Sequence, residues 1–345
     1  MHDYFLTCTE LGRDDFSCLY TQSLMKVNMT ESETKKNETI NTAHPSLQSF
    51  QENINSQYGE DGIIAEILKR LDAESETDHW CVEFGAWNGI YLSNTCNLIK
   101  NNGYKAVLIE ASAEKHKELC KNFPQDDIYK ICAFVDFSGE STLDNILAKT
   151  PIPNDFDFLS IDIDGCDYFI LESLKTFKPK VICIEFNPTI PNEVEFVQPK
   201  DFKIKQSSSP RSIVALAKSK GYLLAAATFC NLFFIKEDLY EIVTGNSIPS
   251  SLESLRDDTE TKTYLFIGFD GTVLSNRDSI YIPWHQITLK PRDIQQIPAY
   301  LRTYPADYSY RQRIGFVFFT LFKFPDVFKD RIIGKLKRTL KRNKR

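Results

Sequence analysis

The stretch from Trp80 to Gly89 constrains the fold of this chain more than any other. It reads Trp-Cys-Val-Glu-Phe-Gly-Ala-Trp-Asn-Gly, a short apolar run that ends in an acid and is followed by two glycines four positions apart. Such a run predicts a buried parallel strand and then a tight turn, because glycine lets the backbone approach a ligand closely. A helix that follows this turn presents its free N–H groups at the same point. The pattern therefore indicates a site for a nucleotide-like ligand.

Strand-like and helical patterns then alternate along the chain. Ile64, Ile67, Leu68 and Leu71 are spaced as one face of a helix before the first strand. Helical patterns at 113–123 and 143–149 lie between later strands, which predicts an α/β fold with a doubly wound, mostly parallel sheet. The last two strands are close in sequence, so they form a hairpin and one strand is antiparallel. The strand-like runs are 80–84, 106–109, 128–134, 156–163, 181–186, 222–227 and 232–235.

Acidic side chains follow the first five of these strands. Because the carboxyl ends of parallel strands meet at one edge of a sheet, where ligands bind, we expect these residues to line one site. Each residue taken alone also fits a turn or a helix cap, but five acidic ends at one edge favour a functional role. The residues are Glu83 with the Gly85, Ala86 and Gly89 turn, then Glu110, Asp136, Asp162 with Asp164, and Glu185 with Asn187.

The acids discriminate between ligands. A phosphate-rich ligand would be repelled unless a metal ion intervened, whereas S-adenosylmethionine has a sulfonium, an ammonium and a ribose diol. The Gly85–Gly89 turn lacks both the three-glycine dinucleotide motif and the Lys-Ser/Thr of a phosphate-binding loop. Glu110 lies 21 positions after Gly89, about where a carboxylate accepts hydrogen bonds from ribose hydroxyls. With the antiparallel strand, these features favour a class I methyltransferase.

Five short motifs follow one another along the chain: SQYGED at 56–61, VEFGAWNG at 82–89, TLD at 142–144, FLSIDIDG at 158–165 and NLFF at 231–234. The chain resembles the FkbM-like S-adenosylmethionine-dependent methyltransferases over residues 56–238. The resemblance implies a Rossmann-like sheet, S-adenosylmethionine as the methyl donor, a cofactor-covering segment that contains Gln57, and O-methylation of a hydroxyl on a saccharide or small natural product. At 162–167, many members have Asp-Val-Glu-Gly-x-Glu, whereas this chain has Asp-Ile-Asp-Gly-Cys-Asp, in which the shorter aspartate stands in place of each glutamate.

Roles follow for the individual residues. Asp162 is the first candidate for the catalytic residue, because it ends the central strand and can take the proton of the acceptor hydroxyl, and Asp164 is the second. A Mg²⁺ ion that polarises the hydroxyl is an alternative, with Asp162, Glu185 and Asn187 as hard oxygen ligands. The predicted cofactor-binding residues are Gln57, Glu83, Gly85, Ala86, Gly89, Glu110, Asp136 and Asp162.

Two other classes of function stay open. The Asp162-Ile163-Asp164 sequence is also a DxD motif, which in a glycosyltransferase would bind a metal ion and a nucleotide sugar. That alternative leaves the Gly85–Gly89 turn unexplained. A non-catalytic binding module that has kept the methyltransferase fold is the second alternative, and it would bind the cofactor without turnover.

Composition divides the chain into four parts. We expect a polar flexible segment at 1–50, a methyltransferase domain at 51–240, an appended lid or dimerisation element at 241–310 and a basic amphipathic tail at 311–345. The tail has twelve Lys and Arg against two Asp, although the formal net charge of the whole chain is −6. It predicts peripheral contact with an anionic membrane; non-specific phosphate binding and docking on the acidic body are alternatives. We expect no specific nucleic-acid partner, and a homodimer stays open.

Cysteine usage and hydropathy indicate where the chain is found. Nine cysteines, an odd number without a CxxC pair, predict reduced thiols rather than a disulfide framework or a zinc site. No apolar run approaches the roughly 20 residues of a membrane helix, and the N-terminus has no basic segment followed by an apolar core. We therefore expect a cytoplasmic protein, at most peripheral to a membrane.

Overall fold

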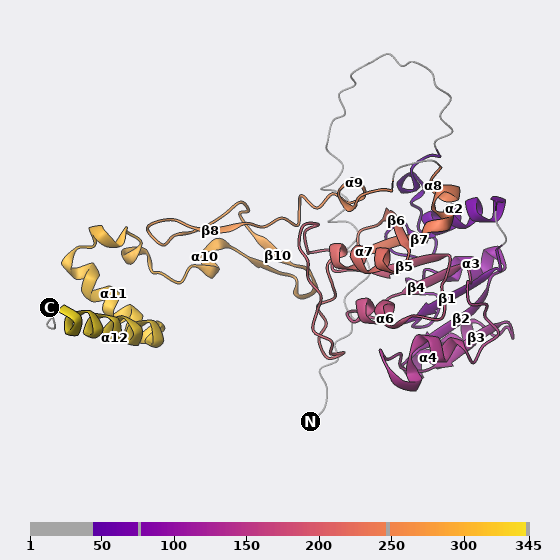
Figure 1. Cartoon of the computed structure of the whole chain (residues 1–345), viewed down its shortest axis with the longest axis horizontal. Helices are drawn as coiled ribbons and strands as arrows, with labels where there is room; N and C mark the ends of the chain where they lie inside the picture. The colour runs from indigo at the N-terminus through magenta and orange to yellow at the C-terminus, as the bar shows by residue number, and fades with distance from the viewer. Residues whose placement is uncertain (1–43, 75–76, 246–248, 343–345) are drawn as a thin grey trace, which may run out of the picture. The chain divides into compact units, whose positions relative to one another are not determined.

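The computed structural model describes residues 44–74, 77–245 and 249–342, with side chains as far as 334 (Figure 1). The flexible segment predicted at 1–50 lies mostly outside these residues. The part inside them is folded, because Leu47 is buried in the short helix η1 (Leu47–Phe50). Gln48 Nε2 donates hydrogen bonds to the carbonyl oxygens of Ala227 at 2.8 Å and Leu255 at 3.1 Å. The end of the segment predicted as flexible is therefore part of the fold.

A seven-stranded sheet forms the centre of the domain. Its order is β3-β2-β1-β4-β5-β7-β6, and β7 runs antiparallel to both of its neighbours while the other six strands run in one direction. All seven predicted strands are present, and the predicted hairpin and antiparallel strand are confirmed. The strands are β1 (Trp80–Phe84), β2 (Lys105–Glu110), β3 (Ile128–Cys132), β4 (Phe158–Ile161), β5 (Val181–Glu185), β6 (Tyr222–Ala227) and β7 (Asn231–Lys236).

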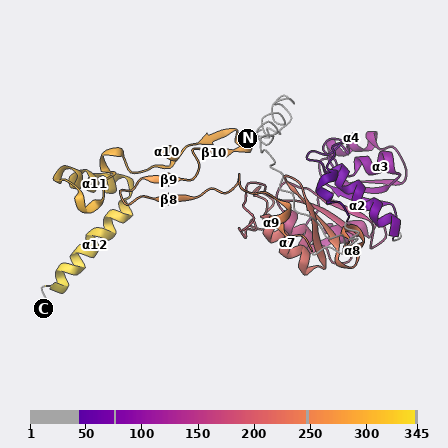
Figure 2. The same ribbon diagram turned by 90° about the horizontal axis from the view of Figure 1, so that it is seen from above.

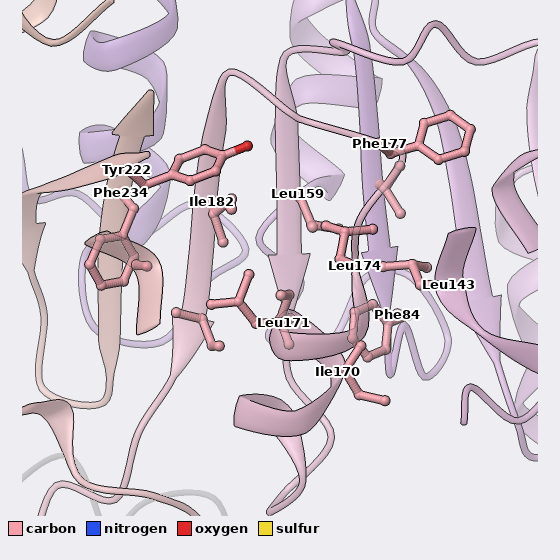
Figure 3. Packing of buried hydrophobic residues seen from close by; sticks show 14 of the residues in the cluster. Phe84, Leu143, Leu159, Ile170, Leu171, Leu174, Phe177, Ile182, Tyr222 and Phe234 are labelled. Carbon is pink, nitrogen blue, oxygen red and sulfur yellow. The ribbon is translucent and has the colours of Figure 1, made fainter. Parts of the chain in front are cut away.

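Helices cover both faces of this sheet (Figure 1). One core cluster joins the sheet to α5, α6 and α7, and Figure 3 shows its packing. A second cluster joins the opposite face to α2, α3, α4 and α8. The doubly wound α/β fold is thus confirmed. The helices are α2 (Glu60–Glu74), α3 (Cys96–Asn102), α4 (Ala113–Asn122), α5 (Leu143–Leu147), α6 (Asp167–Ser173), α7 (Pro210–Ser219), α8 (Tyr240–Thr244) and α9 (Leu252–Leu255), with 3-10 turns η2 (Gly139–Ser141) and η3 (Glu237–Leu239).

Residues after 262 form short elements, drawn in orange and yellow in Figure 2. Two small antiparallel pairs come first, and two longer helices end the chain. No helix in the described part of the chain combines the length and the apolar character needed to span a bilayer. The elements are β8 (Leu265–Ile267), β9 (Val273–Ser275), β10 (Ile280–Ile282), η4 (Pro283–His285), β11 (Ile287–Leu289), α10 (Pro291–Ile294), η5 (Ala299–Leu301), η6 (Pro305–Asp307), α11 (Tyr310–Lys323) and α12 (Pro325–Arg342).

Candidate active site

Strand alternation places the polar residues of the carboxyl edge on one face of the sheet. Val82 and Phe84 belong to the core cluster of one face, so Glu83 between them points to the other. The same alternation applies along β5, where Ile182 and Ile184 lie in that cluster. Glu185 therefore lies on the same face as Glu83, and so does Asn231, its partner on the antiparallel strand β7. The residues that this pattern gathers on the face covered by α2 and α3 are Glu83, Glu110, Glu185 and Asn231.

The predicted glycine turn follows β1 and is packed against protein. Gly85 has φ +76°, and a Cβ atom there would lie 1.9 Å from the carbonyl oxygen of Asp162. Gly89 also has φ +76°, and a Cβ atom there would come within 2.5 Å of Leu119 and of Phe123. The close approach expected of a ligand is thus made by the chain itself. Because Gly85 lies directly on the end of β4, Asp162 is held beside the turn.

Glu110 ties the end of β2 to the same turn. Its Oε2 atom accepts a hydrogen bond from the Trp87 N–H at 2.8 Å, and its Oε1 atom accepts one from the Ser112 N–H at 2.6 Å. The Ala86 N–H adds a bond to the carbonyl oxygen of Ile109 at 3.1 Å. A carboxylate has about four lone-pair positions, so Glu110 keeps acceptor capacity for a ligand. The structure thus places Glu110, Ala86 and the glycines together.

Glu83 is occupied by the segment before α3. Its carboxylate accepts hydrogen bonds from the hydroxyls of Ser93 at 2.6 Å and Thr95 at 2.7 Å, and from the Asn94 N–H at 2.8 Å. Burial raises the pKa of Glu83, and these three bonds oppose that rise. What the structure shows for Glu83 is the positioning of residues 93–95, and its contact with a cofactor stays a prediction.

Three carboxylates converge beyond β4 and β5. One oxygen from each of Asp162, Asp164 and Glu185 lies within 4.8 Å of the others. Burial and the charges of Asp167 and Asp164 raise the pKa of Asp162 to about 8. Burial and the charge of Asp162 raise the pKa of Glu185 well above its ordinary value. Bound protons therefore neutralise part of the negative charge of this cluster.

Asp167 holds the turn that presents these acids. Its Oδ1 and Oδ2 atoms accept hydrogen bonds from the N–H groups of Ile163 and Gly165, both at 2.9 Å. Asp164 between them has φ +54°, a left-handed conformation that is uncommon outside glycine. Asp167 is almost fully buried, and burial raises its pKa to about 6. Of the three acids in 162–167, the third therefore positions the other two.

Asn187, a predicted metal ligand, is used by its own turn. Its Oδ1 atom accepts hydrogen bonds from the N–H of Thr189 at 2.9 Å and from its hydroxyl at 2.7 Å. Its Nδ2 atom donates to the carbonyl oxygen of Gln206 at 2.8 Å. Asp164 instead completes the group of oxygens around Asp162 and Glu185. The remaining predicted residue, Asp136, lies beyond β3, and its Oδ1 atom accepts a hydrogen bond from the N–H of Phe137 at 2.6 Å.

The 53–61 segment contributes residues that the analysis of strand ends missed. The Gln57 side chain is exposed, whereas Glu60 is fully buried and accepts hydrogen bonds from the Tyr58 N–H and the Thr228 hydroxyl, both at 2.6 Å. Asn231 Nδ2 donates to the same carboxylate at 3.2 Å. Asp61 Oδ2 accepts three bonds, from the N–H groups of residues 54–56. The SQYGED and NLFF motifs were the only sequence signal for this pairing.

Two buried acceptor atoms in this region have no hydrogen-bond partner within the described protein. They are Oδ1 of Asp61, a residue 2% exposed, and Oδ1 of Asn231, a residue 5% exposed. A buried acceptor without a partner costs about 1–3 kcal/mol, so such atoms call for a donor. These two atoms are therefore acceptors whose hydrogen-bonding capacity no described residue uses.

This strand order, with a glycine turn after β1 and acids at the carboxyl edge, is that of the class I methyltransferase fold. Residues 139–224 match the methyltransferase FkbM domain, which confirms the resemblance in the sequence. Over these residues the chain matches the FkbM methyltransferases, and the class of enzyme that the match and the fold support is an S-adenosylmethionine-dependent methyltransferase.

Solved methyltransferase structures resemble this chain at low sequence identity. Among curated proteins, none matches the sequence. A SAM-dependent methyltransferase from Aquifex aeolicus is 13% identical, with a TM-score of 0.28 over 49% of this chain and 87% of the other. An S-adenosylmethionine-dependent methyltransferase from Clostridium acetobutylicum is 10% identical, with a TM-score of 0.34 over 53% of this chain and 93% of the other. The glycopeptide N-methyltransferase MtfA, complexed with S-adenosylmethionine, is 11% identical, with a TM-score of 0.30 over 50% of this chain and 85% of the other.

Proposed function

We propose that this enzyme methylates a hydroxyl oxygen on a saccharide or a small natural product. The observation that supports the proposal is the group of converging carboxylates at the end of β4 and β5, held beside the glycine turn. A transferred methyl group leaves the acceptor hydroxyl with a proton to lose, and a carboxylate at this edge is suited to take it. The FkbM resemblance favours a hydroxyl acceptor over other nucleophiles.

The residues at this edge fit the cofactor. S-adenosylmethionine, when bound, supplies an electrophilic methyl group on a positively charged sulfur. Asp162 and Glu185 have raised pKa values, so a nearby cation stabilises their charged forms and relieves the repulsion between them. Asp61 Oδ1 and Asn231 Oδ1 are buried acceptors that an ammonium group would satisfy. Glu110 keeps lone pairs for hydroxyl donors.

Asp162 is the proposed general base. Its backbone is fixed against Gly85, and the turn after it is clamped by Asp167, so the carboxylate has a defined position. Without a cation its pKa is about 8, which leaves it mostly protonated at neutral pH. A positive charge in the site lowers that pKa and produces the carboxylate that removes the acceptor proton. General-base help of this kind contributes about 10²–10⁴ in rate.

A divalent cation is a second candidate for activating the acceptor. Asp162, Asp164 and Glu185 would hold it, because their oxygens lie within 4.8 Å of one another and carboxylate oxygens are the ligands that Mg²⁺ prefers. When bound, such an ion lowers the pKa of a hydroxyl directly. This ligand set replaces the one predicted with Asn187.

Calorimetry and mass spectrometry test the proposal. S-adenosylhomocysteine should bind with one site per chain, while a nucleotide sugar should not bind. A panel of saccharides and polyols incubated with S-adenosylmethionine should contain a product heavier by one methylene group. Asp162→Asn should lower turnover by about 10²–10⁴ and retain S-adenosylhomocysteine binding. Turnover that survives treatment with EDTA would favour the carboxylate mechanism over the metal mechanism. A nucleotide sugar that binds in place of S-adenosylhomocysteine would contradict the proposal.

We also propose a reducing, cytoplasmic location. It is supported by the cysteines in the described part of the chain, which are free thiols, several of them buried. A thiol-labelling assay on protein from unlysed cells, treated with an impermeant reagent, would test it, because cytoplasmic thiols are protected until lysis.

A further inference from the structure

Helix α11 exposes a continuous apolar face. Spacings of three and four place the side chains on one side of a helix, so they form a single stripe. The exposed fractions of these apolar side chains range from 38% at Leu321 to 79% at Phe322. We call this the α11 stripe, and it consists of Ile314, Val317, Phe318, Leu321 and Phe322.

The opposite side of α11 is already used. Phe316 packs edge-on against Tyr308 at 5.6 Å between ring centroids, and Phe319 packs against Phe324 at 5.6 Å. Arg331 of α12 lies over the Phe316 ring at 4.8 Å. Because these contacts orient the helix within its own segment, the α11 stripe is the side that this packing leaves exposed. A contiguous apolar stripe that stays exposed on a helix indicates an interaction surface.

The segment around the stripe is strongly basic. From Arg311 to Arg345 the sequence has twelve Lys and Arg against two Asp, in a chain whose total is −6. Arg311 and Lys323, at the two ends of α11, are exposed, and so is Lys329 in α12. A surface that is both apolar and cationic matches a surface that offers acyl chains and negative charge together.

We propose that α11 and α12 dock on a membrane that contains anionic lipid. The α11 helix has 14 residues, short of the roughly 20 that a span needs, so it lies in the plane of the interface with the stripe in the acyl boundary. Each basic residue near an anionic surface adds about 1 kcal/mol of attraction. A symmetric dimer through the same stripe would instead bring two strongly basic segments together. Nucleic-acid phosphates would use the charge but leave the stripe exposed.

Vesicle flotation with the full-length protein tests the inference. Vesicles of phosphatidylcholine with phosphatidylserine should bind the protein, vesicles of phosphatidylcholine alone should not, and added salt should weaken binding. Phe318→Ser combined with Phe322→Ser should reduce binding at least about tenfold, because two aromatic side chains no longer leave water. Arg311→Glu with Lys323→Glu should reduce binding to the anionic vesicles as well.

Controls separate docking from misfolding and from other partners. Phe269→Ser removes a side chain that is 92% exposed but lies outside α11, and it should bind vesicles as the wild type does. Each variant should bind S-adenosylhomocysteine like the parent, which shows that the domain is folded. Unchanged vesicle binding by the Phe318/Phe322 variant would overturn the inference. So would a stripe-dependent dimer in light scattering without vesicle binding, or binding to duplex DNA in preference to anionic vesicles.

Discussion

Asp162 shows how one residue can be costly for the fold and useful for the chemistry. Its pKa rises from 3.8 to about 8 because burial and neighbouring acids disfavour the charge. The folded state thus holds a proton that the unfolded chain has lost between these two pH values. Stability from this group is fully present below about pH 4 and is lost as pH rises through about 8.

Asp162→Asn should therefore stabilise the ligand-free enzyme in a pH-dependent way. The amide has no charge to lose, so the gain in melting temperature should grow from about pH 4 to about pH 8. Each kcal/mol gained raises the melting temperature by about 2–4 °C in a domain of this size. Thermal melts in EDTA across this range measure the effect. A gain that is constant with pH would show that Asp162 is not the titrating group.

Cofactor binding should release protons from the same residue. At neutral pH a cationic ligand converts protonated Asp162 to its carboxylate, so S-adenosylmethionine should release up to about one proton per site. S-adenosylhomocysteine, whose sulfur is neutral, should release fewer. Calorimetry in two buffers with different ionisation enthalpies gives the number directly. The buffer dependence should disappear in Asp162→Asn, and its persistence there would assign the proton to another group, such as Glu185.

At the scale of the elements, strands were predicted better than loops and ends. All seven strands were identified because their buried residues form short apolar runs, which can be recognised in one sequence without an alignment. The start of the fold was missed because the sequence around Gln48 has no helical or strand periodicity. Gln48 is held there by hydrogen bonds to backbone oxygens that are distant in the sequence. The site followed the same division: Asp162, Asp164 and Glu185 come from strand ends, whereas Glu60 meets Asn231 across 171 positions.

The glycine turn allows a matched test at this scale. Gly85→Ala puts a methyl group 1.9 Å from the backbone oxygen of Asp162, and backbone cannot move aside as a flexible side chain can. We expect a loss of about 3 kcal/mol or more in the free energy of unfolding, with weaker S-adenosylhomocysteine binding. Gly103→Ala is the control, because φ there is +70° and nothing lies within 4 Å. It should lose only about 1 kcal/mol, the cost of the left-handed backbone. Equal losses in urea denaturation would show that backbone strain alone, and not contact with β4, explains Gly85.

At the scale of the whole molecule, cofactor binding and surface docking use different parts of the chain. The two core clusters of the sheet contain no described residue beyond Leu255. The hydrogen bonds of Arg256 to the carbonyl oxygens of Pro188 and Ile190 extend the domain only slightly further along the chain. The basic segment that contains α11 and α12 therefore contributes to neither sheet core, and its loss should leave both intact.

A chain that ends before Ser309 tests this division of roles. Its methyltransferase domain should melt at the same temperature and bind S-adenosylhomocysteine within about twofold of the full chain, because a twofold change is only about 0.4 kcal/mol. It should no longer float with anionic vesicles, since the removed segment has twelve Lys and Arg against two Asp and leaves a more acidic protein behind. Differential scanning fluorimetry, calorimetry and flotation on one preparation give all three results. A loss of cofactor affinity beyond about tenfold would show that the last helices complete the active site, and the two functions would then have to be treated as one.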